Sequence, residues 1–180
     1  MKKALVVLLC LFILCSCSEK PKDNGFEIYT EDIDMSLYEG VEKESCFKKT
    51  IITEIDRCLK EGGSGVFYLG YVDCAYCQSM VRYLNEVALE LGVTVYYVDA
   101  FDEQEPYFDH QDMYIEDLYT VLEEEDGEKV VYTPHVFTII NGRVASSQIS
   151  AKDWDMNGPT DEQISKLKDR YRKMLKPFVL

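Results

Sequence analysis

Two cysteines separated by two residues, where an apolar run gives way to a helical pattern, constrain this chain more than any other feature. Residues 66–72 are apolar, aromatic and β-branched over the length of one strand, which predicts a buried strand. From Cys74 to Leu91 the apolar side chains recur at helical spacing, and Gly92 follows, as expected of a helix end. Cys74 and Cys77 therefore lie on the first turn of a predicted helix that follows a buried strand.

The first turn of a helix favours a thiolate, because its backbone amides are unpaired and the helix dipole is positive there. Cys74 at the tip gains more from this than Cys77, which lies one turn further in on the same side of the helix. The spacing thus supplies an exposed nucleophile and a buried resolving thiol within disulfide reach. Asp73 places a negative charge beside Cys74, so we expect this thiol to be less acidic than that of the strongest oxidants.

The first residues read as an export signal. Lys2 and Lys3 are basic, and residues 4–14 contain no charged side chain; this run is too short to span a membrane, which takes about 20 apolar residues. Leu14-Cys15-Ser16-Cys17 resembles the lipobox of bacterial lipoproteins, which implies cleavage before Cys17 and a lipid on its sulfur. An ordinary signal peptide and an uncut signal anchor remain alternatives. The lipoprotein interpretation predicts an extracytoplasmic, membrane-anchored protein.

We therefore expect three parts: a signal peptide over 1–16, a lipidated N-terminus and polar tether over 17–35, and one domain over 36–180. The net charge is −14, and loss of the two signal lysines makes it about −16. Such a surface repels nucleic acid phosphates and anionic headgroups. Nucleic acid is accordingly not an expected partner, and membrane association is expected to come from the lipid on Cys17.

The remaining cysteines are assigned by spacing. Cys46 and Cys58 fall on a predicted helix over residues 44–61, about 18 Å apart at 1.5 Å per residue, too far to bridge. Buried apolar roles are expected for both, and a regulatory disulfide at Cys46 stays open. In an oxidising compartment, disulfide chemistry is the natural use of the Cys74–Cys77 pair.

The other predicted elements complete an α/β architecture with a central mixed sheet and helices on both faces. Asn141-Gly142 is the two-residue turn chemistry of a tight hairpin. Thr160, with Gln163 three residues later, is a helix-capping pattern. The predicted ranges are a strand over 93–98, a helix over 112–124, strands over 136–140 and 144–149, and a helix over 160–175.

This order, with Cys-x-x-Cys after a strand and Thr133-Pro134 before the hairpin, resembles the thioredoxin superfamily over residues 44–175. The resemblance implies a thioredoxin fold in which Pro134 is the cis-proline that packs against the sulfurs and keeps metal out. It also implies that Thr133 offers backbone groups to an extended substrate. Tyr76, between the cysteines, is expected to bind substrate as well.

Residues 67–71 before the pair, together with Tyr76 inside it, look most like the bacteriocin transport accessory group. Two departures from thioredoxin are visible. Tyr68 stands where thioredoxin carries a buried acid, and Asp73 replaces the tryptophan that usually precedes the pair. The missing acid puts fast proton transfer to Cys77 in doubt, and with it efficient general reductase activity.

The resemblance implies a thiol–disulfide oxidoreductase acting on protein or peptide disulfides. Cys74 attacks, Cys77 resolves the mixed disulfide, and the redox-active pair replaces any organic cofactor. A separate redox partner must reset the pair. The alternative is a binding module for a secretion or bacteriocin export system, in which the disulfide is structural.

Metal binding is a weaker interpretation. Cys74 and Cys77 with His110 and His135 could ligate zinc, but there is no second close cysteine pair and a proline beside the sulfurs normally excludes metal. The acidic residues between 99 and 126 match no calcium loop. We expect no metal, a solvated acidic face, and a packing role for Trp154.

Overall fold

The computed structural model describes residues 19–102, 123–125, 128–130, 132–149 and 154–179. Strands and helices alternate in the first half of the chain, and the second half has successive strands followed by a helix. In order they are β1 (Phe47–Lys49), α1 (Ile52–Lys60), β2 (Gly65–Gly70), α2 (Ala75–Leu91), β3 (Val95–Asp99), β4 (Glu123–Glu125), β5 (Glu128–Val130), β6 (His135–Ile140), β7 (Arg143–Ile149), α4 (Asp161–Leu175) and the short 3₁₀ helix η2 (Lys176–Phe178).

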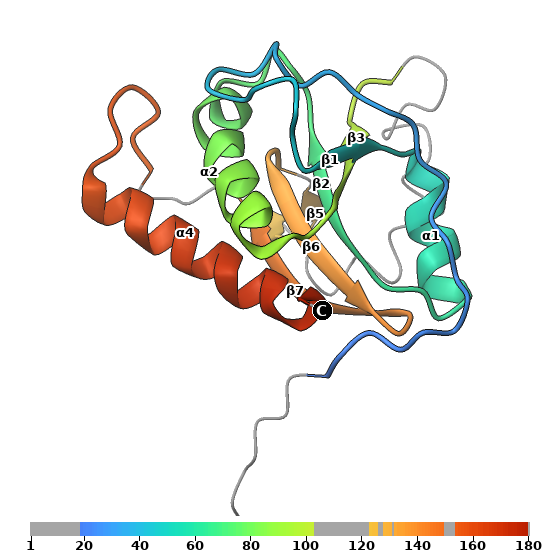
Figure 1. Ribbon diagram of the computed structural model, residues 1–180. Helices are drawn as coiled ribbons and strands as arrows, with labels where there is room; N and C mark the ends of the chain where they lie inside the picture. Colours follow the sequence, from blue (N-terminus) through green and yellow to red (C-terminus); the bar gives the residue numbers. More distant parts are fainter. Residues whose placement is uncertain (1–18, 103–122, 126–127, 131, 150–153, 180) are drawn as a thin grey trace, which may run out of the picture.

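The main sheet has five strands in the order β1-β3-β2-β6-β7, and β4 pairs separately with β5. β1, β3 and β2 are parallel, whereas β2, β6 and β7 are antiparallel. Figure 1 shows α2 and α4 on one face of this sheet and α1 on the other. The predicted thioredoxin fold, a mixed sheet with helices on both faces, is therefore confirmed.

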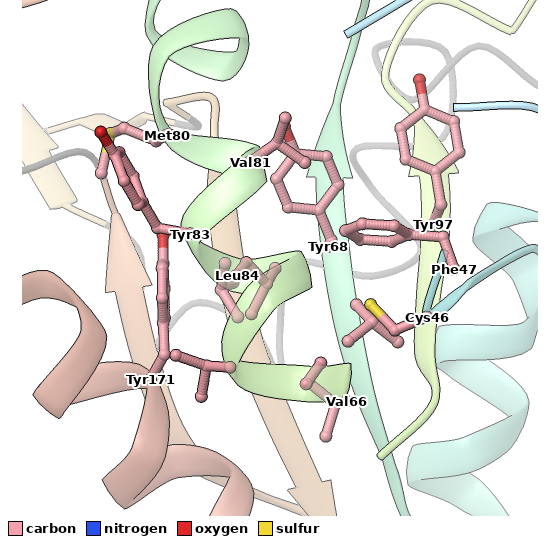
Figure 2. Close-up of a cluster of buried hydrophobic side chains, with 14 of the residues drawn as sticks. Cys46, Phe47, Val66, Tyr68, Met80, Val81, Tyr83, Leu84, Tyr97 and Tyr171 are labelled. Atoms are coloured by element: carbon pink, nitrogen blue, oxygen red, sulfur yellow. The ribbon is translucent and has the colours of Figure 1, made fainter. Parts of the chain in front are cut away.

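The two cores follow from strand alternation, because successive side chains of a strand point to opposite faces. On β2, Tyr68 packs among the residues of α2 and α4, whereas Phe67 and Leu69 pack with those of α1. All three side chains are at most 2% exposed, so β2 is the buried centre of the fold. Figure 2 shows the first core, with Tyr68 beside Val81 of α2.

The caps predicted for the two long helices are present. Gly92 ends α2 in the left-handed conformation, with φ of 66°, which a residue with a side chain rarely adopts. Thr160 caps α4 by accepting a hydrogen bond from the Gln163 amide, and Gln163 bonds back to the Thr160 amide. Both helix ends can thus be read from the sequence.

The hairpin between β6 and β7 turns at Asn141 and Gly142, which both have positive φ, 51° and 76°. A Cβ on Gly142 would lie 2.7 Å from the carbonyl oxygen of Leu59. Glycine is therefore required here for space as well as for conformation. The turn is further held against the end of α1 by the Gly142 amide, which donates to the Gly63 carbonyl.

The prediction of one helix over residues 44–61 is wrong for residues 44–51. Phe47–Lys49 forms β1, which pairs in parallel with β3, and the helix begins at Ile52. The apolar spacing that suggested a longer helix arises because Phe47 lies in one core and the helix residues in the other. A three-residue edge strand is too short to show a period of its own.

The predicted helix over 112–124 lies mostly outside the described residues. Its last part differs from the prediction, since Glu123–Glu125 is strand β4 and pairs antiparallel with Glu128–Val130. The acidic composition of this segment gave no strand signal.

The segment before β1 does not behave as a free tether where the structure describes it. Met35 is 1% exposed and Tyr38 is 2% exposed, so the first core includes residues on both sides of the predicted domain boundary. Earlier in the segment, the Tyr29 amide donates to Glu54 Oε2 at 2.8 Å. The Arg57 guanidinium lies 4.2 Å from the ring centre of Phe26, so these residues cover α1.

Candidate functional site

Cys74 and Cys77 lie where the chain leaves β2 and enters α2. The Cys74 amide donates to the Tyr71 carbonyl at 3.3 Å, which closes the turn between strand and helix. Cys74 is the N-cap residue of α2, and the two cysteines form a disulfide with their Cα atoms 5.1 Å apart, within the normal range. The predicted pair is thus brought together in its oxidised form.

The two sulfurs differ in access. Cys74 retains 6% of its surface, whereas Cys77 is fully buried. The Cys77 amide donates to Cys74 Sγ at 3.1 Å, so a free backbone donor of the helix already points at the outer sulfur. This amide would stabilise negative charge on Cys74 after reduction, and attack by a thiol from outside is directed to Cys74.

Thr133, in the loop just before β6, lies against the disulfide. Cys74 Sγ is 3.7 Å from the carbonyl oxygen of Thr133 and 3.5 Å from its Oγ1. The Thr133–Pro134 peptide bond is cis, as the resemblance predicted, and Pro134 is buried. The pairing of β2 with β6, in register at Leu69 and His135, fixes this arrangement. The substrate-binding roles of Thr133 and Pro134 remain predictions.

Exposed aromatic side chains lie on two chain segments next to the pair: Tyr76 follows Cys74 in the sequence, and Phe101 follows Ala100, whose amide donates to the Gly70 carbonyl at the end of β2. Tyr76, between the cysteines, is 36% exposed, and Phe101 beyond β3 is 54% exposed. Phe101 makes an edge contact with Tyr71 at 4.5 Å between ring centres. Phe101 was not predicted as part of the site, since nothing in the sequence relates it to the cysteines.

Gln78, the residue after the buried cysteine, was also missed. Its Nε2 donates to the carbonyl oxygens of Val72 at 2.7 Å and of Leu37 at 3.2 Å. Its Oε1 accepts from the Glu39 amide at 2.9 Å. Gln78 therefore holds residues 36–40, far away in the sequence, beside the disulfide. Leu37, which this contact places at the site, is 71% exposed.

Behind the disulfide lies a group of buried tyrosines. The hydroxyls of Tyr38 and Tyr97 are 3.1 Å apart, and that of Tyr97 also donates to the Gly70 carbonyl. Tyr68 stacks on Tyr97, but its own hydroxyl has no hydrogen-bond partner among the described residues. Burial raises the pKa of Tyr68 well above its ordinary value. Tyr68 therefore stays neutral and offers Cys77 no carboxylate-like base.

The side chain of His135, a candidate zinc ligand, contacts Ser147 and Phe137. Its Nε2 lies 2.8 Å from Ser147 Oγ, and its ring contacts Phe137 of the second core. Burial lowers its pKa to about 4, so the imidazole is neutral at physiological pH. Because the His135 ring packs against Phe137 of the second core, whereas Cys77 belongs to the first, this histidine does not join the sulfurs. His110 lies outside the described residues.

Across the described ranges, no three or more His, Cys, Asp or Glu side chains gather as a metal site would require. The same part of the chain holds no helix long and apolar enough to cross a membrane. Cys17, the predicted lipidation site, lies outside the described residues.

Cys46 and Cys58 are free thiols and both are buried. They belong to different cores, on opposite faces of the sheet, rather than to one helix as predicted. The expected buried roles are confirmed all the same. Burial raises the pKa of both thiols to about 12, which makes them poor nucleophiles.

Trp154 packs as expected. It is 6% exposed and makes an edge contact with Tyr83 of α2. Its indole N–H donates to Ser79 Oγ at 2.9 Å, so the segment before α4 is held against α2.

No family model and no curated protein sequence matches this chain. Among solved structures it is similar to a thioredoxin from Fasciola hepatica, with 14% identity and a TM-score of 0.41 over 69% of this chain and 94% of that one. A thioredoxin pre-protein from Schistosoma mansoni has 13% identity and a TM-score of 0.42, over 70% and 95%. Thioredoxin O2 from Arabidopsis thaliana has 16% identity and a TM-score of 0.42, over 70% of this chain and 93% of that one. The fold assignment rests on the strand order and connections of this chain.

Proposed function

We propose that this chain is an extracytoplasmic thiol–disulfide oxidoreductase, anchored to the membrane by a lipid on Cys17. The observation that carries the redox part is the disulfide itself. Its outer sulfur, on Cys74, lies at a helix N-terminus and contacts Thr133, while its inner sulfur is closed off from solvent. Location and substrate follow from the export signal and from the disulfide chemistry of that compartment.

The reaction runs through exchange at sulfur. With the pair oxidised, a substrate thiolate attacks Cys74 Sγ, a mixed disulfide forms, and Cys77 leaves as a thiolate. A second substrate thiolate then attacks the substrate sulfur of the mixed disulfide and releases Cys74 as a thiolate. Two electrons pass from substrate to the Cys74–Cys77 pair, and the substrate gains a disulfide. In the reverse direction Cys74 attacks a substrate disulfide and Cys77 resolves it.

The residues around the sulfurs have separate parts in this scheme. The Cys77 amide and the Thr133 hydroxyl lie within hydrogen-bond reach of Cys74 Sγ and stabilise it as a thiolate leaving group. The Thr133 carbonyl and the exposed ring of Tyr76 offer polar and apolar contact to a peptide. A reduced or oxidised protein segment is therefore the proposed substrate class.

The deciding experiment equilibrates the full mature protein with glutathione redox buffers and measures the fraction of Cys74–Cys77 disulfide. A potential between about −120 and −270 mV places the pair among known exchange proteins, and its value gives the direction. Failure of the pair to exchange at all, in protein that remains folded, would sink the catalytic proposal.

The second candidate is a binding module with a structural disulfide. It is favoured by the low exposure of Cys74, 6%, and by Tyr68, which gives Cys77 no acid–base group. Replacing Cys74 by Ser separates the two: retained biological function with an intact fold supports the module, and lost function supports the enzyme.

A further inference from the structure

Asn141, at the tip of the β6–β7 hairpin, holds the chain near its predicted membrane anchor. Its Nδ2 donates to Glu19 Oε1 at 2.9 Å and to the Lys20 carbonyl at 3.2 Å, and its Oδ1 accepts from the Lys22 amide at 2.9 Å. One side chain thus makes three hydrogen bonds to residues 19–22. The start of the described chain is fastened to the hairpin tip.

The following residues continue along the domain without a loose stretch. Asn24 Nδ2 donates to the Gly62 carbonyl at 2.9 Å. Glu31 and Lys49 then exchange two backbone hydrogen bonds of 2.9 Å each, which form a bridge to β1. We call residues 19–31 the N-terminal strap. Its contacts run from the hairpin tip to the edge of the sheet. The strap therefore lies along the domain surface and does not extend away from it.

The strap starts at the end of the sheet opposite the disulfide. β6 begins beside Cys74, through the Thr133 contact, and ends at the Asn141 turn. Eight residues of extended chain separate Thr133 from Asn141, which corresponds to about 25 Å. Figure 1 shows the first described residues, in blue, near the turn of the β6–β7 hairpin and away from the N-terminus of α2.

The charges differ between these two ends. In residues 19–23 the two lysines balance Glu19 and Asp23, and the exposed Arg143 beside the turn adds a positive charge. At the disulfide end, Asp73 and Glu39 are both exposed. Anionic headgroups are repelled by acidic surface, so the hairpin end is the one suited to lie near them.

We propose that the domain stands on an anionic lipid bilayer with the Asn141–Gly142 turn toward the lipid and the disulfide facing away. The inference rests on the proposed lipidation of Cys17. Since Cys17 is two residues from Glu19, the anchor lies within about 7 Å of Glu19 Cα, whereas a free tether over residues 17–35 would reach about 60 Å. The strap therefore sets both the distance of the disulfide from the membrane and the direction in which it faces.

The test uses the lipidated mature protein in vesicles of phosphatidylcholine and phosphatidylglycerol that carry an acceptor dye in the headgroup region. A donor dye is attached through an azido amino acid at position 143, beside the turn, or at position 37, beside the disulfide. With the two ends about 25 Å apart, the donor at 143 should be quenched at least about twofold more strongly. Equal quenching, or stronger quenching at 37, overturns the orientation.

The variant Asn141→Ala tests whether the hydrogen bonds of the Asn141 side chain cause the orientation. Removing the three hydrogen bonds should free residues 19–22 from the hairpin tip and bring quenching at the two positions closer together, and circular dichroism checks that the fold is retained. Asn157→Ala, in an exposed loop where the amide and not the side chain bonds to Asp155, is the matched control and should leave the difference intact. An unchanged difference in Asn141→Ala shows that the strap does not orient the domain and overturns the proposal.

Lipidation itself is measured first, by detergent partitioning and by the mass of the N-terminal peptide, with Cys17→Ser as the unlipidated reference. A protein without lipid overturns both the anchoring and the orientation. A lipidated protein with equal quenching overturns the orientation alone. The glutathione equilibrium of the Cys74–Cys77 pair is independent of both, so the redox proposal is judged separately.

Discussion

The hydroxyl of Thr133 lies 3.5 Å from the sulfur of Cys74, although 59 residues separate the two in the chain. This contact joins the loop before β6 to the N-terminus of α2, and it places a neutral donor beside the sulfur that would carry negative charge after reduction. The reduced state of the pair is therefore stabilised from two sides, by the hydroxyl and by the Cys77 amide.

Thr133→Val should make the pair harder to reduce. Loss of a hydrogen bond to a charged sulfur costs about 1.5 kcal/mol, which moves the reduction potential to more negative values by about 30 mV. The measurement is the glutathione equilibrium of the variant. Thr94→Val, at an exposed position, is the control and should leave the potential unchanged; an equal potential in Thr133→Val would show that the hydroxyl does not act on Cys74.

Cys77→Ser should trap substrate. Once Cys74 has attacked a disulfide, no second sulfur is available to release it, so a mixed disulfide accumulates and is seen as a heavier band without reducing agent. Cys74→Ser should give no such band, because Cys77 is fully buried. Cys58→Ala, on the other face of the sheet, is expected to trap nothing. Equal trapping by Cys74→Ser would mean that the inner sulfur is the nucleophile.

The two free cysteines should resist alkylation in the folded protein. With the pKa of Cys46 and Cys58 raised to about 12, on the order of one thiol in ten thousand is ionised at pH 8. Iodoacetamide should therefore label neither within an hour, and both after denaturation, as counted by intact mass. Rapid labelling of Cys46 in folded protein would contradict the buried role and revive a regulatory one.

The protein should lose stability in mild acid through His135. Its pKa is about 6.5 in an unfolded chain and about 4 when folded, so the unfolded state binds a proton that the folded state refuses. The free energy of unfolding is fully retained above pH 6.5 and falls by up to about 3 kcal/mol as the pH drops towards 4.

Urea denaturation at several pH values measures this loss. His135→Gln can keep the bond to Ser147 but does not titrate, so the pH dependence of its stability should be shallower than that of the natural protein. Parallel curves for the two proteins between pH 7 and pH 4 would show that another group controls the acid response.

Tyr68 and Tyr97 form a matched pair in one core. Tyr68→Phe removes a buried hydroxyl that has no described partner, so stability should be unchanged or higher by about 1 kcal/mol. Tyr97→Phe removes the bonds to Tyr38 and Gly70 and should lower stability by about 1 to 3 kcal/mol. Thermal and urea denaturation compare them, and a larger loss for Tyr68→Phe would reveal a partner for its hydroxyl.

The centre of the fold could be predicted because its signals are local. The buried strand at residues 65–70 is apolar throughout, α2 shows helical spacing and ends in Gly92, and the Asn141-Gly142 dipeptide fits a tight turn. Each of these depends on neighbours within a few residues. The Cys-x-x-Cys pair and Thr133-Pro134 were placed together because a resemblance supplied the long-range contact between them.

The missed features depend on partners far away in the chain. β1 exists because Phe47–Lys49 pairs with β3. Three residues are too few to show the alternation of apolar and polar side chains by which a strand is predicted. In the sequence, Met35 and Tyr38 are isolated apolar residues in a polar stretch. In the structure, both are buried in the same core as residues of α2 and β3. Gln78 has an ordinary place on a helix, and its three backbone contacts are visible once residues 36–40 lie beside it.

Gln78 has a consequence for how such a protein can diverge. Because it fixes the loop at 36–40 next to the sulfurs, the surface beside the disulfide and the two cysteines belong to separate stretches of chain. Substitutions at the exposed Leu37 alter that surface without changing the helix that carries Cys74. Under the proposed function, partner choice and redox chemistry can therefore change independently of each other, and position 37 is one at which selectivity can be redesigned.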